Sequence, residues 1–529
     1  MDLGRHAAVV LLSVLMSRSD SHRYDFNLVV IGGGPAGEKG AAQVAYFGLP
    51  DSVIPESCGG RTHQDFRVAL IEREPVLGGA CINTGTLPSK TLRESALILS
   101  GARSRQVGGG VATYVRHDIT LPDFMYRAHF VQERERQRAA LNLERHNVEH
   151  IFASGTLLDD HTVEITEMSG ATRSITAEFI LLATGSSPVR PAHIPFNRDN
   201  VWDSDSVLQM LKLPKSMIVV GGGVIGCEYA CLFHALGIEV TLANRSGRVL
   251  EFLDFEITDR FMELCRTVGI ELALHEDVES CEVTKEPGGT RFVRTKMKSG
   301  RVFLTESMLY AAGRGGNTEG LGLERLGIKI SKYGNLEGVN PHTYQTEVPN
   351  IYAAGDLVGR PALASTGMEQ GRLAMCHAFN IRYRGQELNP VLPAGIYTIP
   401  EISAVGETEE SIKKKNESRA KDGKPPIDYV VGRSQFGDHA RGHIIGDAGG
   451  LVKLIFSAPD GKLLGCTVIG EIASELVHTG MACLQFGGDI NYFINAVFNY
   501  PTLSDVYKYA AYDALGKLNK FRAGMAASV

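Results

Sequence analysis

Tyr24-Asp-Phe-Asn-Leu-Val-Val-Ile31 leads directly into Gly32-Gly33-Gly34-Pro35-Ala36-Gly37, and an alanine-rich stretch follows from Glu38 to Gly48. The order predicts an apolar strand, a glycine turn and a helix. In this context G-x-G-x-x-G is typical of a dinucleotide site, because glycines let backbone N–H groups approach a pyrophosphate at a helix N-terminus. A single motif also fits a tight turn that binds nothing.

A second copy of the pattern lies far downstream. Ser216–Val220 is the expected strand, Gly221-Gly222-Gly223-Val224-Ile225-Gly226 the turn and Cys227–Gly237 the helix. Two correctly flanked motifs make two dinucleotide sites the stronger interpretation. The glycines expected to contact the two nucleotides are Gly32, Gly34 and Gly37 in the first loop and Gly221, Gly223 and Gly226 in the second.

The residue that ends the second strand of each unit indicates which nucleotide binds. Glu72 ends the run that starts at Arg67, and its carboxylate can accept hydrogen bonds from an adenosine ribose, which suits FAD or NAD. Asn244 stands at the matching position and is followed by Arg245 and, farther on, Arg248. Asn is neutral and Arg can bind a 2′-phosphate, so the second site is expected to accept NADP(H) as well as NAD(H). The alternative is that both arginines are solvated loop charges.

The composition is that of an ordinary globular protein. At 529 residues, 43% of them hydrophobic, the chain is too long for one core. A net charge of −6 without a basic stripe argues against a nucleic-acid partner. Nine scattered cysteines do not resemble an extracellular disulfide framework, so the cytoplasm is expected. The apolar run Ala7–Met16 is too short to span a membrane, so no membrane partner is predicted, while organellar targeting by the N-terminal tail stays open.

Motif positions and changes of composition predict five segments. The fold class is α/β, with two Rossmann-like dinucleotide-binding domains and a C-terminal α+β domain in which short strands precede helices. The predicted segments are an N-terminal tail (1–23), the first dinucleotide domain (24–200) with a surface-loop insertion (50–66), the second dinucleotide domain (201–325), the remainder of the first domain (326–388) and the C-terminal domain (389–529).

Cys81-Ile-Asn-Thr-Gly-Thr86-Leu-Pro-Ser-Lys90, led in by Gly78-Gly79, resembles the redox centre of flavoprotein disulfide reductases, whose pattern is C-x4-C. Thr86 stands in place of the second cysteine, and a hydroxyl cannot form a disulfide. In Asn499–Asp505, Tyr500 stands where the family element H-P-T-x-x-E has its general-base histidine. A phenol with a pKa of about 10 is a poor base at neutral pH. Dithiol chemistry needs both lost groups, whereas hydride exchange between nicotinamides needs neither.

With these residues in view, the chain from about Tyr24 to Leu518 resembles the class I pyridine nucleotide–disulfide oxidoreductases, and among them it is most similar to the soluble (Si-specific) NAD(P)+ transhydrogenases. The discriminating stretches are Pro35–Ala42, Thr86, Asn244-Arg245, Ala312–Thr318 and Asn499–Thr502. The resemblance implies noncovalent FAD in the first site, NAD(H) and NADP(H) as substrates, and a C-terminal interface domain that forms a homodimer or a higher homo-oligomer.

The resemblance also implies roles for individual residues. Lys90 and Glu228 would form a catalytic pair near the flavin N5, although a purely structural salt bridge is the alternative, and Asp356 would lie near the ribityl chain. The remaining predicted cofactor-binding residues are Gly78, Gly79, Cys81, Thr184, Gly185 and Gly313.

The predicted function is FAD-dependent hydride transfer between NADPH and NAD+ without a redox disulfide. Two alternatives stay open: a lipoamide-dehydrogenase-like diaphorase or quinone reductase, and a flavin-containing redox sensor that uses Cys81. Cys227, Cys231 and His234 have a spacing that could place metal ligands on one helix face. Because cysteine in a helix packed on a sheet serves as a small apolar residue, no metal site is predicted.

Overall fold

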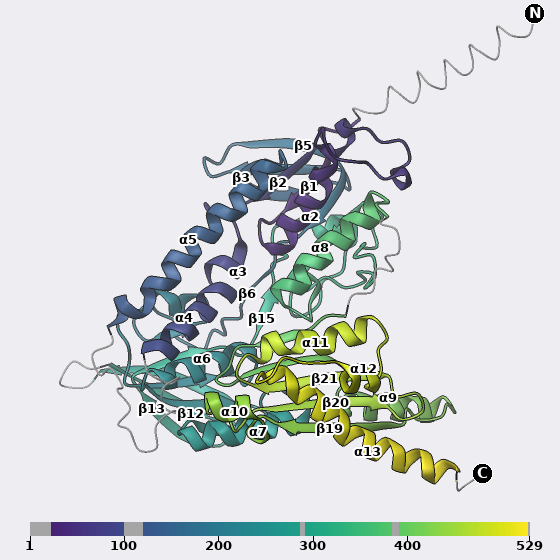
Figure 1. The fold of residues 1–529 in the computed structure, drawn as a ribbon. Helices are drawn as coiled ribbons and strands as arrows, with labels where there is room; N and C mark the ends of the chain where they lie inside the picture. The colour runs from purple at the N-terminus through teal and green to yellow at the C-terminus, as the bar shows by residue number, and fades with distance from the viewer. Residues whose placement is uncertain (1–22, 100–119, 286–290, 383–390, 527–529) are drawn as a thin grey trace, which may run out of the picture. The chain divides into compact units, whose positions relative to one another are not determined.

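The computed structural model describes residues 23–99, 120–285, 291–382 and 391–526, and the chain divides into two compact units (Figure 1). The run Ala7–Met16 lies outside the described residues. The five segment boundaries drawn from the sequence stay predictions. The first unit comprises the described parts of Met1–Leu87, Phe130–Ser187 and Arg314–Asn389, and the second those of Pro88–His129, Pro188–Gly313 and Pro390–Val529.

The first unit is built on a six-stranded sheet. Its strands are β1 (Phe26–Ile31), β2 (Val68–Glu72), β3 (Glu149–Leu157), β4 (Thr162–Glu167), β5 (Thr172–Leu182) and β16 (Ile351–Ala353). β1 lies between β2 and β5 and is parallel to both, β3 is parallel to β2, and β16 is parallel to β5. β4 is antiparallel to β3 and β5. The central strands are almost wholly buried, as expected of parallel strands covered on both faces.

Helices α2 (Pro35–Ala45) and α8 (Ala364–Ala378) run side by side in this unit (Figure 1). Pro35 stands at the first turn of α2, where its missing N–H leaves no hydrogen bond unmade. Helix α3 (Gly79–Asn83) is short, and a two-stranded sheet joins β6 (Ser186–Pro188) to β15 (Arg314–Gly316). Helices α4 (Thr86–Leu99) and α5 (Leu121–Arg145) each contain a boundary between the units.

The insertion at 50–66 is only partly a surface loop. It contains two short 3-10 turns, and the side chains of Cys58 and Phe66 are buried, at 6% and 3% exposure. Arg61 forms an ion pair with Glu178 of β5, and its guanidinium lies 4.9 Å from the centre of the Phe379 ring. The expectation of a surface loop is therefore wrong for these residues, because an aromatic and a thiol enter the core.

The second unit contains a five-stranded sheet that is parallel throughout. In spatial order its strands are β10 (Glu271–Leu274), β9 (Glu239–Asn244), β8 (Ser216–Val220), β14 (Ser307–Tyr310) and β7 (Val201–Asp203). Helix α6 (Val224–Ala235) follows β8, and helix α7 (Phe255–Val268) begins where Asp254 accepts a hydrogen bond from the N–H of Glu256. Three antiparallel strands were not expected from the sequence: β11 (Val278–Lys285), β12 (Arg291–Met297) and β13 (Val302–Thr305).

The C-terminal part of the second unit is an antiparallel sheet with helices. Its strands are, in order, β17 (Ala394–Ile396), β18 (Glu401–Gly406), β21 (Leu463–Gly470), β20 (Leu451–Ser457) and β19 (Tyr429–Gln435). Its helices are α9 (Glu409–Lys421), α10 (Ala440–Ile445), α11 (Ala473–Gln485), α12 (Ile490–Asn495) and α13 (Val506–Ala526), of which α13 lies along β19 and β20 (Figure 1). The predicted α/β class, with two Rossmann-like parts and a C-terminal α+β part, is confirmed.

Two general features concern the whole described chain. All nine cysteines lie within it, and none forms a disulfide. Of the helices in the described ranges, none has both the length and the apolar character that crossing a membrane requires.

A buried ion cluster in the second unit involves Lys453 of β20, whose side chain is 2% exposed. Its ammonium lies 2.8 Å from Asp254, 2.9 Å from Glu256 and 2.6 Å from Glu409. A buried charge is tolerated only when it is paired in this way. Burial by itself would raise the pKa of Glu256, but hydrogen bonds from Arg433 and Lys453 outweigh it and lower that pKa to about 2.

We expect this cluster to make the protein acid-sensitive. The pKa of Glu256 is lower in the folded state than its ordinary 4.5, so its stabilisation is complete above that pH and is lost as the pH falls towards about 2. Because the pair is partly exposed and screened, we expect a loss of about 1 kcal/mol. Urea unfolding at a series of pH values should therefore show a smaller acid effect in Glu256→Gln than in the wild type. An equal acid effect in both proteins would contradict this assignment.

Candidate functional site

The first glycine loop joins β1 to α2. The Gly33 N–H donates a 2.7 Å hydrogen bond to Glu72 Oε2. Glu72 is the last residue of β2, at the strand end where the sequence predicted it. A Cβ added to Gly37 would lie 1.9 Å from the Gly32 carbonyl oxygen, so the close packing of helix against turn requires glycine there. A Cβ added to Gly34 would meet only the Cα of Gly79, at 3.9 Å. The loop therefore leaves open space at a helix N-terminus.

The second glycine loop repeats this arrangement between β8 and α6. The Gly222 N–H donates to Asn244 Oδ1 at 3.0 Å. A Cβ on Gly226 would lie 1.8 Å from the Gly221 carbonyl oxygen, whereas a Cβ on Gly223 would meet nothing within 4 Å. Both loops thus combine a tightly packed third glycine with an open middle glycine. Each fits a dinucleotide pyrophosphate.

The side chains that follow the second loop are not equally available to a nucleotide. Asn244 is turned inward, because its Nδ2 donates to Ser246 Oγ at 2.9 Å and to the Arg248 carbonyl at 2.8 Å. Arg248 donates to Thr258 Oγ1 at 2.8 Å and forms an ion pair with Asp259. Arg248 is therefore not a solvated loop charge, because its Nη1 is held by α7. Arg245 is exposed, and no hydrogen bond or ion pair joins it to another described residue.

Lys90 and Glu228 are brought together in the second unit from helices α4 and α6. Lys90 Nζ lies 2.6 Å from Glu228 Oε2, and the Glu228 side chain is 6% exposed. Glu228 Oε1 accepts a 2.9 Å hydrogen bond from the N–H of Tyr397. The Lys90 ammonium also lies 5.0 Å from the centre of the Tyr397 ring. Tyr397 was missed from the sequence, since a tyrosine that follows a short strand carries no distinguishing signal.

Asp356 lies in a hydrogen-bonded group of the first unit. Its Oδ2 accepts a 2.6 Å hydrogen bond from Ser186 Oγ, and Ser186 Oγ accepts one of 2.9 Å from Arg314 Nε. Thr184 Oγ1 donates to the carbonyl of Asn317 at 2.7 Å. Thr184 and Asp356 therefore both take part in polar contacts around β6 and β15. Ser186 and Arg314 belong to the same contacts, and the sequence did not indicate them. Two predicted glycines occupy turns with positive φ, Gly185 (71°) and Gly313 (149°).

The residues of the altered redox motif begin two successive helices. Gly78 and Gly79 have φ values of 97° and 52° and open α3, which contains Cys81, while Thr86 is the first residue of α4. At the other altered position Tyr500 is 76% exposed. Asp505 Oδ2 lies 3.6 Å from Nδ1 of the buried His439. Neither of the two altered positions, Thr86 and Tyr500, supplies a thiol.

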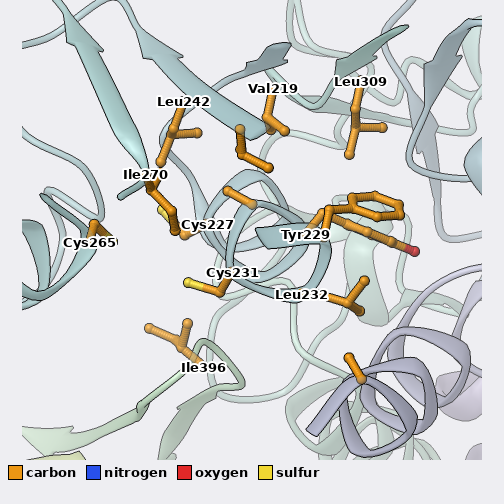
Figure 2. Close-up of a cluster of buried hydrophobic side chains, with 14 of the residues drawn as sticks. Val219, Cys227, Tyr229, Cys231, Leu232, Leu242, Cys265, Ile270, Leu309 and Ile396 are labelled. Carbon is orange, nitrogen blue, oxygen red and sulfur yellow. The ribbon is translucent and has the colours of Figure 1, made fainter. Parts of the chain in front are cut away.

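The cysteines of α6 belong to the core, as Figure 2 shows for Cys227 and Cys231 among Val219, Leu242 and Ile270. Burial raises the pKa of the Cys227 thiol well above its ordinary value. His234 Nε2 is hydrogen-bonded to the Val268 carbonyl at 2.9 Å. In the described part of the chain, no group of three or more His, Cys, Asp or Glu residues is placed to hold a metal ion.

Known proteins match the sequence of this chain over nearly its full length. The soluble pyridine nucleotide transhydrogenase of Mycobacterium bovis (strain BCG / Pasteur 1173P2) is 39% identical over 503 residues, which cover 94% of this chain and 99% of the relative. That of Pseudomonas putida (strain W619) is 36% identical over 500 residues, with coverage of 94% and 99%.

Solved structures also match this chain over most of its length. The crystal structure of LpdA from Mycobacterium tuberculosis matches with a TM-score of 0.77 and 28% identity, covering 92% of this chain and 99% of that one. The flavoprotein disulfide reductase RclA from Escherichia coli, at 23% identity and a TM-score of 0.75, shares the fold, with coverage of 91% and 99%.

Two family patterns cover most of the chain. Residues 26–371 match the pyridine nucleotide-disulphide oxidoreductases, and residues 392–511 match the dimerisation domain of the same family. This second match agrees with the antiparallel sheet and helices found there. The chain therefore belongs to the pyridine nucleotide-disulphide oxidoreductase family.

Proposed function

We propose that this chain is an FAD-dependent transhydrogenase that exchanges hydride between NADPH and NAD+ without a redox disulfide. The observation that carries the proposal is the presence of two open glycine loops together with Thr86 at the second cysteine position. A dithiol substrate needs a thiol pair, whereas exchange between two nicotinamide nucleotides needs only sites for nucleotides. The relatives of this length bear the name soluble pyridine nucleotide transhydrogenase.

The residues assigned to each nucleotide form two sets. When bound, FAD supplies reversible hydride chemistry, and the residues proposed to hold it are Gly32, Gly34, Gly37, Glu72, Gly78, Gly79, Cys81, Thr184, Gly185 and Asp356. Those proposed to hold NAD(H) or NADP(H) are Gly221, Gly223, Gly226, Asn244, Arg245 and Gly313.

Lys90 and Glu228 are proposed to act as one unit at the flavin. The carboxylate holds the ammonium in place, and a fixed positive charge stabilises negative charge that develops beside it. Asn244 acts indirectly in this proposal, because its amide supports the glycine loop and the turn that contains Arg245.

The match to a dimerisation domain supports a homo-oligomer, and we propose a homodimer or a higher assembly. We propose the cytoplasm as the location, a choice supported by nine scattered cysteines that form no disulfide.

An anaerobic titration tests the function. NADPH should bleach the absorbance of the bound flavin, and NAD+ added afterwards should restore it with no dithiol present. NADP+ serves as the matched nucleotide control, since it reverses the first half-reaction without exchange. If NAD+ leaves the flavin bleached while a quinone restores its colour, the transhydrogenase assignment is wrong and a diaphorase is the better description.

A further inference from the structure

The carboxyl ends of β9 and β10 lie side by side in the second unit. These strands are parallel and in register, with Asn244 opposite Leu274. Arg245 and His275 are consequently the first residues beyond two adjacent strands. In open α/β sheets ligands bind outside the carboxyl ends of the strands, so both residues stand at the edge where a nucleotide is expected.

Two polar side chains at this edge already form hydrogen bonds within the protein. The Asn244 amide and Nη1 of Arg248 are hydrogen-bonded within the protein, as described above. Arg245 is exposed and forms no hydrogen bond or ion pair within the described chain. A doubly charged phosphate is bound best by more than one donor, so a second group beside Arg245 is of interest.

His275 supplies that second group. It is exposed and has a φ of 59°, the left-handed region that a residue with a side chain seldom adopts. Its N–H donates to the Ser246 carbonyl at 3.2 Å. Its ring lies against Gly247, since a Cβ added there would be 2.6 Å from both Cε1 and Nε2. The unusual backbone thus places an imidazole against the turn that contains Arg245, and unusual φ values of this kind concentrate at functional sites.

Carboxylates near His275 in the chain are paired with other groups. Glu276 accepts a 2.6 Å hydrogen bond from Ser299 Oγ and lies 3.5 Å from Arg301. Asp277 forms a 2.6 Å ion pair with Lys298. These pairings make the two carboxylates weaker competitors for Arg245 and reduce their repulsion of a phosphate.

We propose that His275 is a specificity-determining residue that, together with Arg245, recognises the 2′-phosphate of NADP(H). The inference rests on the proposed function, because it concerns the same nucleotide site. Imidazole N–H and guanidinium groups both donate to phosphate oxygens, and NAD(H) lacks the phosphate that they would bind. His275 therefore favours NADP(H) without taking part in NAD(H) binding.

Calorimetric binding of two adenosine fragments to the flavin-loaded enzyme tests this without hydride transfer. For His275→Ala we expect 2′,5′-ADP to bind about 10-fold more weakly, while 5′-AMP stays within about twofold. Gly247→Ala keeps the imidazole but displaces the ring, so it should give the same selective loss. His193→Ala, at another exposed histidine of the same unit, should change neither affinity.

The outcomes separate the possible roles of the ring. Equal weakening of both fragments would overturn the proposal, because the ring would then contact adenosine rather than the phosphate. Unchanged binding of 2′,5′-ADP in His275→Ala would overturn it as well. A selective loss of 2′,5′-ADP supports the proposal even if NAD+ fails to restore the flavin colour, so failure of the proposed function remains distinguishable.

Discussion

Gly37→Ala is expected to yield a protein that retains no flavin and unfolds at a much lower temperature than the wild type. The added Cβ would lie 1.9 Å from the Gly32 carbonyl oxygen and 3.1 Å from Val30 Cγ1. The first of these atoms belongs to the backbone of the same turn, so it cannot move aside without separating α2 from β1. We expect a cost of about 3 kcal/mol. Thermal unfolding and the flavin content after gel filtration measure the two effects.

Gly34→Ala is the matched control in the same loop. Its added Cβ would meet only Gly79 Cα, at 3.9 Å, so we expect the unfolding free energy to stay within about 1 kcal/mol of the wild type. The methyl group nevertheless occupies the open space into which a pyrophosphate would fit, so flavin content should fall. Full flavin content in Gly34→Ala would show that the cofactor does not use this loop.

Glu228→Ala is expected to slow the bleaching of the flavin by NADPH by about 100-fold. The carboxylate holds the Lys90 ammonium at 2.6 Å, and the Lys90 side chain is 24% exposed. Without its partner the ammonium can turn into water, and the site loses its fixed positive charge. The N–H of Tyr397 loses its acceptor at the same time. Anaerobic stopped-flow absorbance measures the rate.

Two further variants show whether the Glu228 effect is specific. Glu228→Gln retains acceptor oxygen for Lys90 or Tyr397 and should recover part of the rate. Glu279→Ala removes an exposed ion pair with Lys296 of 2.9 Å, and we expect its rate within about twofold of the wild type. If Glu228→Ala bleaches at the wild-type rate but unfolds earlier, the pair is a structural salt bridge and has no part in hydride transfer.

The sequence predicted those features that depend on a local pattern. The strand, turn and helix around Gly32–Gly37 and around Gly221–Gly226 were recognisable because glycine spacing and apolar runs are short-range signals. Lys90 and Glu228 are far apart in the chain, and their proximity was implied by family resemblance rather than by any local pattern.

Side-chain direction and tertiary contacts could not be read in the same way. Nothing in the sequence indicates that Arg248 turns towards α7 while Arg245 stays exposed, since this depends on where Thr258 and Asp259 lie. The positive φ of His275 depends on its fit against Gly247. The insertion was expected at the surface because it contains Pro50, Pro55, Gly59 and Gly60, yet Phe66 enters the core.

The burial of the cysteines affects how the enzyme withstands chemical stress. Eight of the nine are buried, and Cys81 alone is partly accessible. A reductase that cycles through a dithiol exposes its working sulfurs to hypochlorous acid, peroxides and alkylating agents, all of which attack accessible thiolates. Here the same reagents meet a threonine at position 86, a partly accessible Cys81 and eight buried thiols. An oxidant therefore finds no dithiol to oxidise in this motif, and Cys81 is the one cysteine of the nine that is not buried.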